Sequence, residues 1–335
     1  MQFSTSCSPF IPANTSVNRV MRQVLIGLLP ALGVMFWLFG YTVLLQLLLA
    51  SSTALIAEAA CLWLRKRPIK VHLFDLSALI TAALLALAIP TIAPWWISVS
   101  GTLFAIIIAK QVYGGLGYNP FNPAMAGYVF LLISFPLQMT AWQTPYTFLP
   151  VFDALDLVFS EQAIFDGLSS ATVLDSIKTY RSSELLLTEM PSPSIFGFIA
   201  GKGWELVSLA YLLGGLWLLY RKIIGWHIPA AVLLGLYVPA SIYHLIDATS
   251  TSSPLLHLFS GASLCGAFFI ATDPVSAATS NAGRIMYGII IGLLIYIIRT
   301  WGGYPDAIAF AVLLANLAAP GIDYYLRPIP ANQQL

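Results

Sequence analysis

The chain has 335 residues with a formal net charge of +1, and 59% of them are hydrophobic but only 9% are charged. An ordinary soluble domain has roughly 25% charged residues, so the composition excludes that class. The apolar residues form long blocks without the alternation of a membrane β-barrel. No basic cluster interleaved with aromatic residues indicates a nucleic-acid partner. Blocks of about 20 apolar residues predict an all-α polytopic protein in a lipid bilayer.

Ten helical spans are predicted in two groups of five. They cover roughly residues 24–40, 42–64, 75–93, 95–110, 122–137, 203–220, 227–244, 257–272, 284–300 and 304–322. The chain thus divides into an N-terminal half (1–137), a long polar loop (138–201) and a C-terminal half (202–335). Most Lys and Arg residues fall on one side if the spans alternate. The positive-inside rule then predicts cytoplasmic termini and an extracytoplasmic loop.

Two stretches rich in small residues suggest an inverted repeat. SALITAALLALAIP (77–90) lies in the third span and GASLCGAFFIATDP (261–274) in the eighth, and both end in proline. With five spans in each half, the two stretches run in opposite directions, as in folds whose broken helices line a central site. Small residues are also common in ordinary helix packing within membranes, so both interpretations stay open.

The stretch KQVYGGLGYNPFNPAMAG (110–127) joins the fourth and fifth spans. Its glycines permit backbone conformations and close approaches that a side chain would block. Asn122 followed by Pro123 predicts an N-cap and a first-turn proline for the fifth span. No strand precedes the loop, which excludes a dinucleotide-binding fold. A tight connection between helices and a binding loop are the two interpretations.

Ionisable residues near the span ends also have two interpretations. Asp273, in ATDPVSAATSNAGR (271–284), is either a functional group at membrane depth or a cap for the following turn. His72 and Asp75 would share a helix face, as a metal or proton relay or, more simply, with Asp75 capping the third span. The three cysteines are isolated and form no CxxC pair, so no metal or iron–sulfur site is predicted.

The polar loop contains the stretch DGLSSATVLDSIKTY, which begins at Asp166. Asp166 and Gly167 predict a turn, and Ser169, Ser170 and Thr172 offer three hydroxyl oxygens in an exposed stretch. A solvated turn with a helix cap is the purely structural interpretation. No histidine lies nearby to activate a hydroxyl as a nucleophile. No catalytic residue is therefore predicted, and chemistry at Thr172 would require another protein to modify it.

Three motifs together resemble one known family. The stretch from Asp166 to Thr172 resembles the flavinylation motif Asp-Gly/Ala-x-Ser/Thr-Gly/Ser-Ala-Thr. GGLGYNPFNPAMAG and SGASLCGAFFIATDPVSAATSNAGR resemble the two landmark loops of the NqrB/RnfD family, and the similarity covers nearly the whole chain. The resemblance implies a five-plus-five inverted repeat related to urea-transporter-like proteins.

The resemblance also implies cofactors. A dedicated flavin transferase would join FMN to Thr172 through a phosphodiester, guided by the other motif residues Asp166, Gly167, Ser169, Ser170 and Ala171. Relatives also hold a noncovalent riboflavin, for which the candidate residues are Gly114, Gly115, Gly117, Asn119 and Asn122. Asp273 is a further candidate for an ion or flavin site.

The family has two branches, and the compact start before the first span favours RnfD, the membrane component of the Rnf (Rsx) complex. RnfD would relay electrons between ferredoxin- and NAD(H)-linked partners, the A, B, C, E and G components of the same complex. The relay would be coupled to Na⁺ or H⁺ translocation across the bacterial inner membrane, in a translocase whose components do not act alone. The alternatives are NqrB, from a Na⁺-translocating NADH:quinone reductase, and a non-redox solute channel of urea-transporter-like fold.

Overall fold

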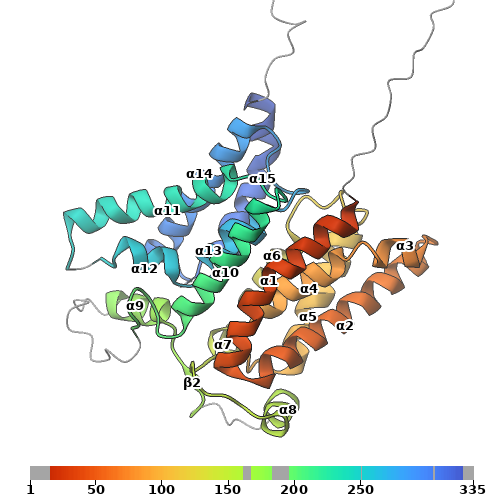
Figure 1. Ribbon diagram of the computed structural model, residues 1–335, viewed down its shortest axis with the longest axis horizontal. Coiled ribbons are helices and arrows are strands. Elements are labelled where there is room, and N and C mark those ends of the chain that lie inside the picture. Colours follow the sequence, from red (N-terminus) through yellow and green to blue (C-terminus); the bar gives the residue numbers. More distant parts are fainter. Residues whose placement is uncertain (1–15, 161–166, 183–195, 250, 305, 327–335) are drawn as a thin grey trace, which may run out of the picture.

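The computed structural model describes residues 16–160, 167–182, 196–249, 251–304 and 306–326, most of which are helical (Figure 1). The first half contains α1 (Val17–Phe39), α2 (Tyr41–Leu64), α3 (Ile69–Leu73), α4 (Ser77–Ala88), α5 (Trp95–Leu103), the π-helical η1 (Phe104–Gln111) and α6 (Pro123–Ser134). The second half contains α10 (Trp204–Tyr220), α11 (His227–Ile246), α12 (Pro254–Phe259), α13 (Ser263–Cys265), the π-helical η4 (Gly266–Ile270), α14 (Asn281–Trp301) and α15 (Ile308–Leu326).

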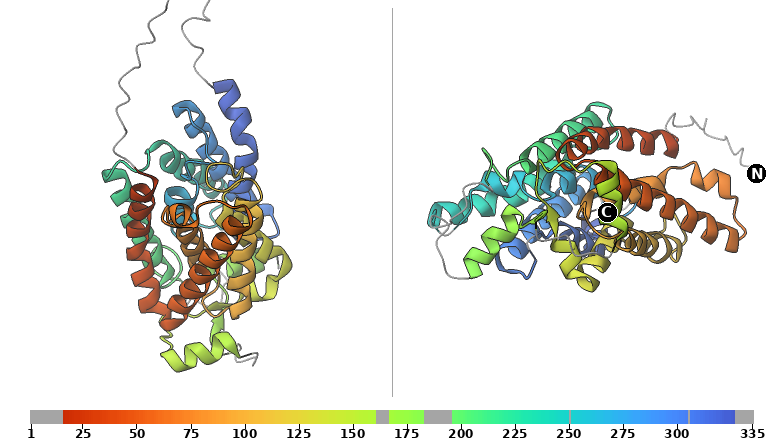
Figure 2. Two further views of the ribbon diagram at one scale, coloured as in Figure 1. Left: turned by 90° about the vertical axis from the view of Figure 1, so that its right-hand side faces the viewer. Right: turned by 90° about the horizontal axis from the view of Figure 1, so that it is seen from below.

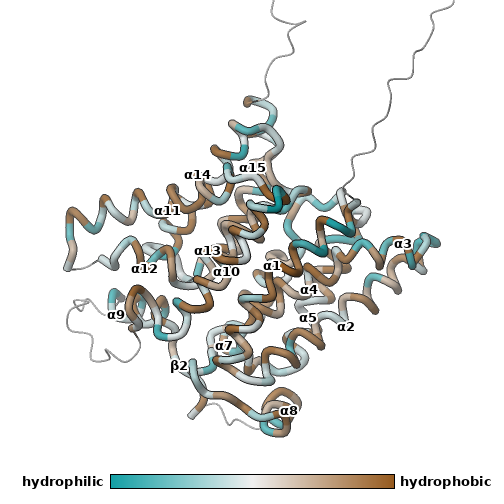
Figure 3. The backbone as a smooth tube through the Cα atoms, in the orientation of Figure 1, coloured by the Kyte–Doolittle hydropathy of each residue, from teal (hydrophilic) through white to brown (hydrophobic). Residues whose placement is uncertain are grey.

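The helices confirm the predicted all-α membrane class. By length and composition, α1, α2, α11, α14 and α15 could each cross a membrane, and α4, α5 with η1, α6 and α10 are shorter apolar helices. The predicted span 257–272 is broken into α12, α13 and η4, because Gly261 turns the chain with a φ of +60°. Hydrophobic residues cover most of the long helices, and hydrophilic residues gather around α3 (Figure 3).

The first and the fifth helices of the two halves pack against each other in pairs. The first helices of the halves, α1 and α10, lie side by side, and so do the fifth helices, α6 and α15 (Figure 2). The end of α1 meets the beginning of α10, where the Phe39 and Trp204 rings lie 5.2 Å apart, so these two helices are antiparallel. Gly27 and Gly214 allow their backbones to touch, since a Cβ on Gly214 would lie 1.9 Å from the Gly27 carbonyl oxygen.

Within residues 138–201, the central segment, the described parts (138–160, 167–182 and 196–201) lie at one end of the helices. The segment begins within α7 (Pro136–Thr140) and continues through β1 (Trp142–Gln143), α8 (Val151–Phe159), β2 (Ser169–Ser170) and α9 (Val173–Ser182). In Figure 1 its described elements occupy the lower end of the molecule, whereas the first and last described residues lie toward the upper end. The described part of the polar loop is therefore on the side opposite both ends of the described chain.

Gln143 fixes the central segment to the helices. Its side chain is fully buried. Its Oε1 accepts hydrogen bonds from the Thr42 and Thr91 hydroxyls, at 3.1 and 2.9 Å, and its Nε2 donates to the Phe39 carbonyl at 3.0 Å. A buried amide with this many partners has no unsatisfied group to penalise the fold. The start of the segment is thus held by α1, α2 and the turn after α4.

The short strand β2 is positioned by β1. The two strands are antiparallel, with Trp142 opposite Ser170 and Gln143 opposite Ser169. The prediction that these serines lie in an exposed stretch is therefore wrong: both are half-buried, because the strand pairing holds them against the molecule. This pairing fixes the position of the backbone just before Thr172, which lies two residues after Ser170.

Candidate functional site

Thr172 directly precedes helix α9 and shares three hydrogen bonds with Asp175. The Thr172 hydroxyl donates to Asp175 Oδ2 at 2.5 Å, and the Asp175 backbone N–H donates to Thr172 Oγ1 at 3.2 Å. The Thr172 backbone N–H also points to Asp175 Oδ2, at 3.3 Å. This reciprocal arrangement is a capping box with aspartate in the position where glutamate is usual. The helix cap that the sequence suggested is present, and it fixes the orientation of the Thr172 oxygen.

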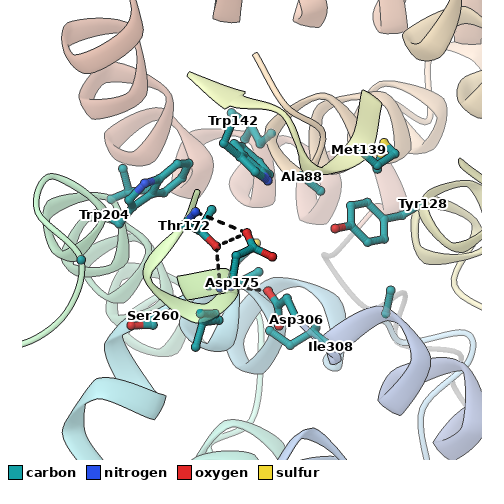
Figure 4. Close-up of a pocket in the computed structure, with 18 of the residues that line it drawn as sticks. Ala88, Tyr128, Met139, Trp142, Thr172, Asp175, Trp204, Ser260, Asp306 and Ile308 are labelled. Carbon is teal, nitrogen blue, oxygen red and sulfur yellow. Dashed lines mark hydrogen bonds between the residues drawn. The ribbon is translucent and has the colours of Figure 1, made fainter. Parts of the chain in front are cut away.

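The Thr172 side chain lines a cavity between the central segment and the helices, which we call the Thr172 cavity (Figure 4). Its walls come from both halves and from the segment itself. Polarisable side chains and two carboxylates define its character: Tyr128, Met139, Trp142, Trp204, Asp175 and Asp306. The two indole rings meet edge to face, with centroids 5.0 Å apart. Aromatic faces of this kind suit a flat conjugated ring.

The electrostatics of this cavity centre on Asp175. Burial raises the pKa of its carboxyl, the hydrogen bonds from Thr172 oppose the shift, and the Asp306 carboxylate adds to it. On the next turn of α9, burial lowers the pKa of Lys178, whose Nζ donates to the Gly302 carbonyl at 2.5 Å. The site therefore holds a carboxyl whose pKa lies above that of a free aspartate, mainly because it is buried.

The other residues of the proposed flavinylation motif lie outside this cavity. Ser169 and Ser170 are in β2 and do not line it. Ala171 is exposed, and Gly167 occupies an exposed turn. Asp166 lies outside the described residues. Of the three hydroxyls that the sequence offered, only the Thr172 oxygen faces the cavity.

A second cavity, the Lys110 cavity, lies beside the loops at the other end of the helices. Its volume of about 740 Å³ is within the range of small-molecule pockets. It brings together Asn119, Asn122 and Asp273, which the sequence analysis had singled out separately. Cationic side chains also line it: Lys110, Lys222 and Arg284. The two landmark loops thus converge on one site.

Asn119 and Asn122 differ in how their polar atoms are satisfied. Asn122 is the predicted N-cap of α6, accepting from the Met125 N–H at 3.2 Å, and Pro123 occupies the first turn. Asn119 is 4% exposed and donates to the Phe121 carbonyl at 2.9 Å, but its buried Oδ1 has no hydrogen-bond partner among the described residues. An unpaired buried acceptor at a cavity wall indicates a place for a donor from a ligand.

The glycines of the loop serve its shape. Gly114, Gly115 and Gly117 have φ values of +132°, +100° and +91°, which favour glycine over other residues. None of the three lines the Lys110 cavity, although Leu116 between them does. The loop therefore contacts the cavity through Leu116, and the three glycines allow the backbone turn that places Leu116 there.

Asp273 fits both of its interpretations. Its Oδ1 accepts from the Val275 N–H at 3.2 Å and its Oδ2 from the Ser276 hydroxyl at 3.0 Å, which is the turn cap. The same residue lines the Lys110 cavity. The side chain therefore holds the turn in shape while presenting a carboxylate to the cavity.

The expectation that His72 and Asp75 share a helix face is wrong. The short helix α3 ends at Leu73 and α4 begins only at Ser77, so the pair spans a break. Asp75 lies one residue before the N-cap residue of α4, Leu76, and its Oδ1 accepts from the first N–H of the helix, that of Ser77, at 2.8 Å. Within the described part of the chain, no three His, Cys, Asp or Glu side chains group as metal ligands would.

Sequence reasoning did not find several residues of the Thr172 cavity. Asp175 could have been found, because it lies three residues after Thr172, the spacing of a capping box. Trp142, Trp204 and Asp306 come from distant parts of the chain and join the site only through packing. No local pattern marks them.

The fold defines a polytopic helical membrane protein with one cavity near each end of its helices. The chain belongs to the NQR2, RnfD, RnfE family, whose model matches residues 4–332. It is 52% identical to a protein of Shewanella frigidimarina and 53% identical to one of Alcanivorax borkumensis, each across 98% of this chain and at least 96% of the relative. A Salmonella paratyphi A protein is 50% identical, with 98% of each chain covered. All three are named as the D component of an ion-translocating oxidoreductase complex.

Proposed function

We propose that Thr172 carries FMN through a phosphodiester to its Oγ1, and that the chain relays electrons through this flavin as the RnfD component of an Rnf-type complex. The observation that carries the proposal is that Thr172 alone among the motif hydroxyls lines the aromatic cavity. Relatives with 50–53% identity bear the name of an ion-translocating oxidoreductase component. The coupled ion would be Na⁺ or H⁺.

The residues of the Thr172 cavity fit such a group. When bound, FMN would supply the electron-transfer chemistry, and the protein would supply position and surroundings. Trp142, Trp204 and Tyr128 would hold the conjugated ring, and Met139 would fill the space beside it. The phosphodiester would lie at the beginning of α9, where backbone N–H groups favour negative charge.

Two measurements test the attachment: flavin fluorescence on a denaturing gel shows whether flavin is covalently bound, and peptide mass spectrometry shows which residue carries it. The chain is co-expressed with its flavin transferase and purified for both. Thr172→Ala should abolish the fluorescence, and Thr172→Ser should reduce it, because serine keeps an oxygen but loses the methyl group that restricts the rotamer. Ser170→Ala is the matched control and should leave labelling near wild type. FMN mapped to Ser169 or Ser170 would contradict the proposal.

A second, noncovalent flavin is proposed for the Lys110 cavity. The unpaired Oδ1 of Asn119 would accept a hydrogen bond from a ring N–H, and the cavity has the volume of a small-molecule site. Riboflavin released by denaturation is measured by chromatography. Asn119→Leu should lose it while covalent FMN stays on Thr172. Riboflavin retained at full occupancy in Asn119→Leu would contradict this site.

The partners are proposed from the same resemblance. The chain would join the A, B, C, E and G components in the bacterial inner membrane, with both termini cytoplasmic and residues 138–201 periplasmic. Affinity purification of the tagged chain should recover ferredoxin-like and NADH-binding proteins, and a reporter inserted at Ser160 should report export. Recovery of quinone-reductase components would assign the chain to the NqrB branch of the family. A chain without any flavin would favour the solute channel.

A further inference from the structure

The Thr172 hydroxyl is already engaged by a carboxylate. Its proton points to Asp175 Oδ2 across 2.5 Å, and the Asp175 N–H occupies another position on Oγ1 at 3.2 Å (Figure 4). A short hydrogen bond to an ionised acceptor is characteristic of a charge-assisted pair. The arrangement directs the hydroxyl proton of Thr172 at Asp175 Oδ2.

Attachment of FMN to a threonine requires the hydroxyl to lose its proton. A threonine hydroxyl is a weak nucleophile, and it is activated by an adjacent base. No histidine is among the described residues that line the Thr172 cavity. Asp175 is the group in hydrogen-bonding contact with the reacting oxygen.

We propose that Asp175 is the proton acceptor for the covalent modification of Thr172, an inference that rests on the proposed function. The flavin donor is a flavin adenine dinucleotide held by the transferase. A lone pair of Thr172 Oγ1 forms the bond to the FMN phosphorus, and the phosphoanhydride bond breaks, so that its electron pair leaves with AMP. Asp175 Oδ2 takes the Thr172 proton. Because Asp175 is only half-buried, that proton can then pass to water.

The surroundings of Asp175 support this role. The charged and titratable groups that face it are Lys178 on α9, Asp306 at the start of α15 and Tyr128 on α6. Burial raises the pKa of the Asp175 carboxyl, with Asp306 acting in the same direction. A base with a pKa nearer the working pH is a more effective acceptor than an ordinary carboxylate.

The test measures the initial rate of covalent FMN incorporation. The purified full-length chain in detergent micelles is mixed with flavin transferase and flavin adenine dinucleotide at a series of pH values. Asp175→Asn retains an oxygen for the helix cap but cannot take a proton. It should slow incorporation by about 100-fold, within the usual contribution of a general base. The wild-type rate should rise with pH as Asp175 ionises, and the variant should lack this rise.

The control is Asp156→Asn. Asp156 accepts from the Ser160 hydroxyl at 2.6 Å, a similar carboxylate–hydroxyl pair in the same central segment but outside the cavity. This variant should match wild type in rate and pH profile. An Asp175→Asn protein that is labelled at the wild-type rate, with the wild-type pH profile, overturns the proposal.

Two further results keep the conclusions separate. A wild-type chain that never acquires FMN on Thr172 would refute the proposed function itself, whereas normal labelling of Asp175→Asn refutes only the role of Asp175. If Asp175→Asn does not fold, Asp175→Glu replaces it, because glutamate keeps a carboxylate. The pH-dependent rise should then remain with a lower plateau, and its disappearance would overturn the inference.

Discussion

The two halves of the molecule use different ion pairs to hold their third spans, which are α4 in the first half and the broken segment of α12, α13 and η4 in the second. In the first half, Lys110 Nζ donates to Glu58 Oε1 at 2.5 Å and to the Ser77 hydroxyl, at the start of α4, at 2.7 Å. We call these three residues the first anchor. Lys110 and Glu58 are each 2% exposed, so the pair is buried on every side.

The second half uses Arg299 near the end of α14. Its guanidinium donates to the carbonyls of His257, at 2.7 Å, and Ser260, at 3.2 Å, which precede α13. It also donates to Asp306 Oδ1 at 2.9 Å. We call these four residues the second anchor. Asp306 is 25% exposed, so water can solvate part of this carboxylate. Both cations lie toward the end of the fourth helix of their half, but only the first anchor depends on a wholly buried partner.

The difference shows how one topology can tolerate different charges. Lys110 and Ser77 of the first anchor line the Lys110 cavity, and Ser260 and Asp306 of the second line the Thr172 cavity. Each anchor therefore supports the wall of one cavity. Because the energetic consequences of losing a partner depend on burial, the two anchors should respond unequally to the same substitution.

The largest effect is expected for Lys110→Met. It removes the cation from the buried Glu58 carboxylate, whose Oε2 has no hydrogen-bond partner among the described residues. Breaking such a pair should lower the free energy of unfolding by about 3–5 kcal/mol. Unfolding in mixed micelles, followed by circular dichroism, measures it. The double variant Lys110→Met/Glu58→Gln should recover much of the loss, and an equal or greater loss would contradict the charge argument.

Gly214→Ala should cost about 3 kcal/mol by the same measurement, because overpacking at a closely packed contact forces the backbone to move. The added Cβ would lie 1.9 Å from the Gly27 carbonyl oxygen, at the contact between the two halves. Gly33→Ala on α1 is the control, since nothing lies within 4 Å of its new Cβ. Equal stability of both variants would show that the halves are held by the anchors and not by this contact.

Arg299→Met should cost about 2 kcal/mol, within the range for leaving polar partners unsatisfied. The smaller expectation follows from the partial exposure of Asp306, which water can hydrate once the guanidinium is gone. The comparison with Lys110→Met is made in the same micelles. A loss in Arg299→Met that exceeds the loss in Lys110→Met would reverse the proposed ranking of the two anchors.

The smallest effect is expected at the caps of the fifth helices. Asn122 Oδ1 caps α6, and Asp306 Oδ1 accepts from the Ala307 N–H at 2.8 Å just before α15. Asn122→Ala should cost about 1 kcal/mol, as for other N-caps. Asn122→Asp keeps an acceptor and serves as the control. A destabilisation above that of Arg299→Met would mean that Asn122 does more than cap its helix.

Local signals predicted those features that depend on neighbouring residues. The N-cap at Asn122 and the helix-initiating Pro123 could be predicted from the sequence, because a cap acts over three neighbouring residues. The hydrogen bond from the Ser77 N–H to Asp75 at the start of α4 is local in the same way. The shared face of His72 and Asp75 was not, because the break between α3 and α4 depends on the path of the backbone.

By itself, the sequence determined the membrane class and the helical segments, because both follow from the length and pattern of the apolar blocks. Thr172 was singled out by the resemblance of its motif to that of a known family. Only the tertiary structure decided which hydroxyl faces a cavity. It also paired Lys110 with Glu58, 52 positions apart, and placed Trp142 beside Trp204. Contacts between such distant residues depend on how the helices cross and pack, which no local pattern specifies.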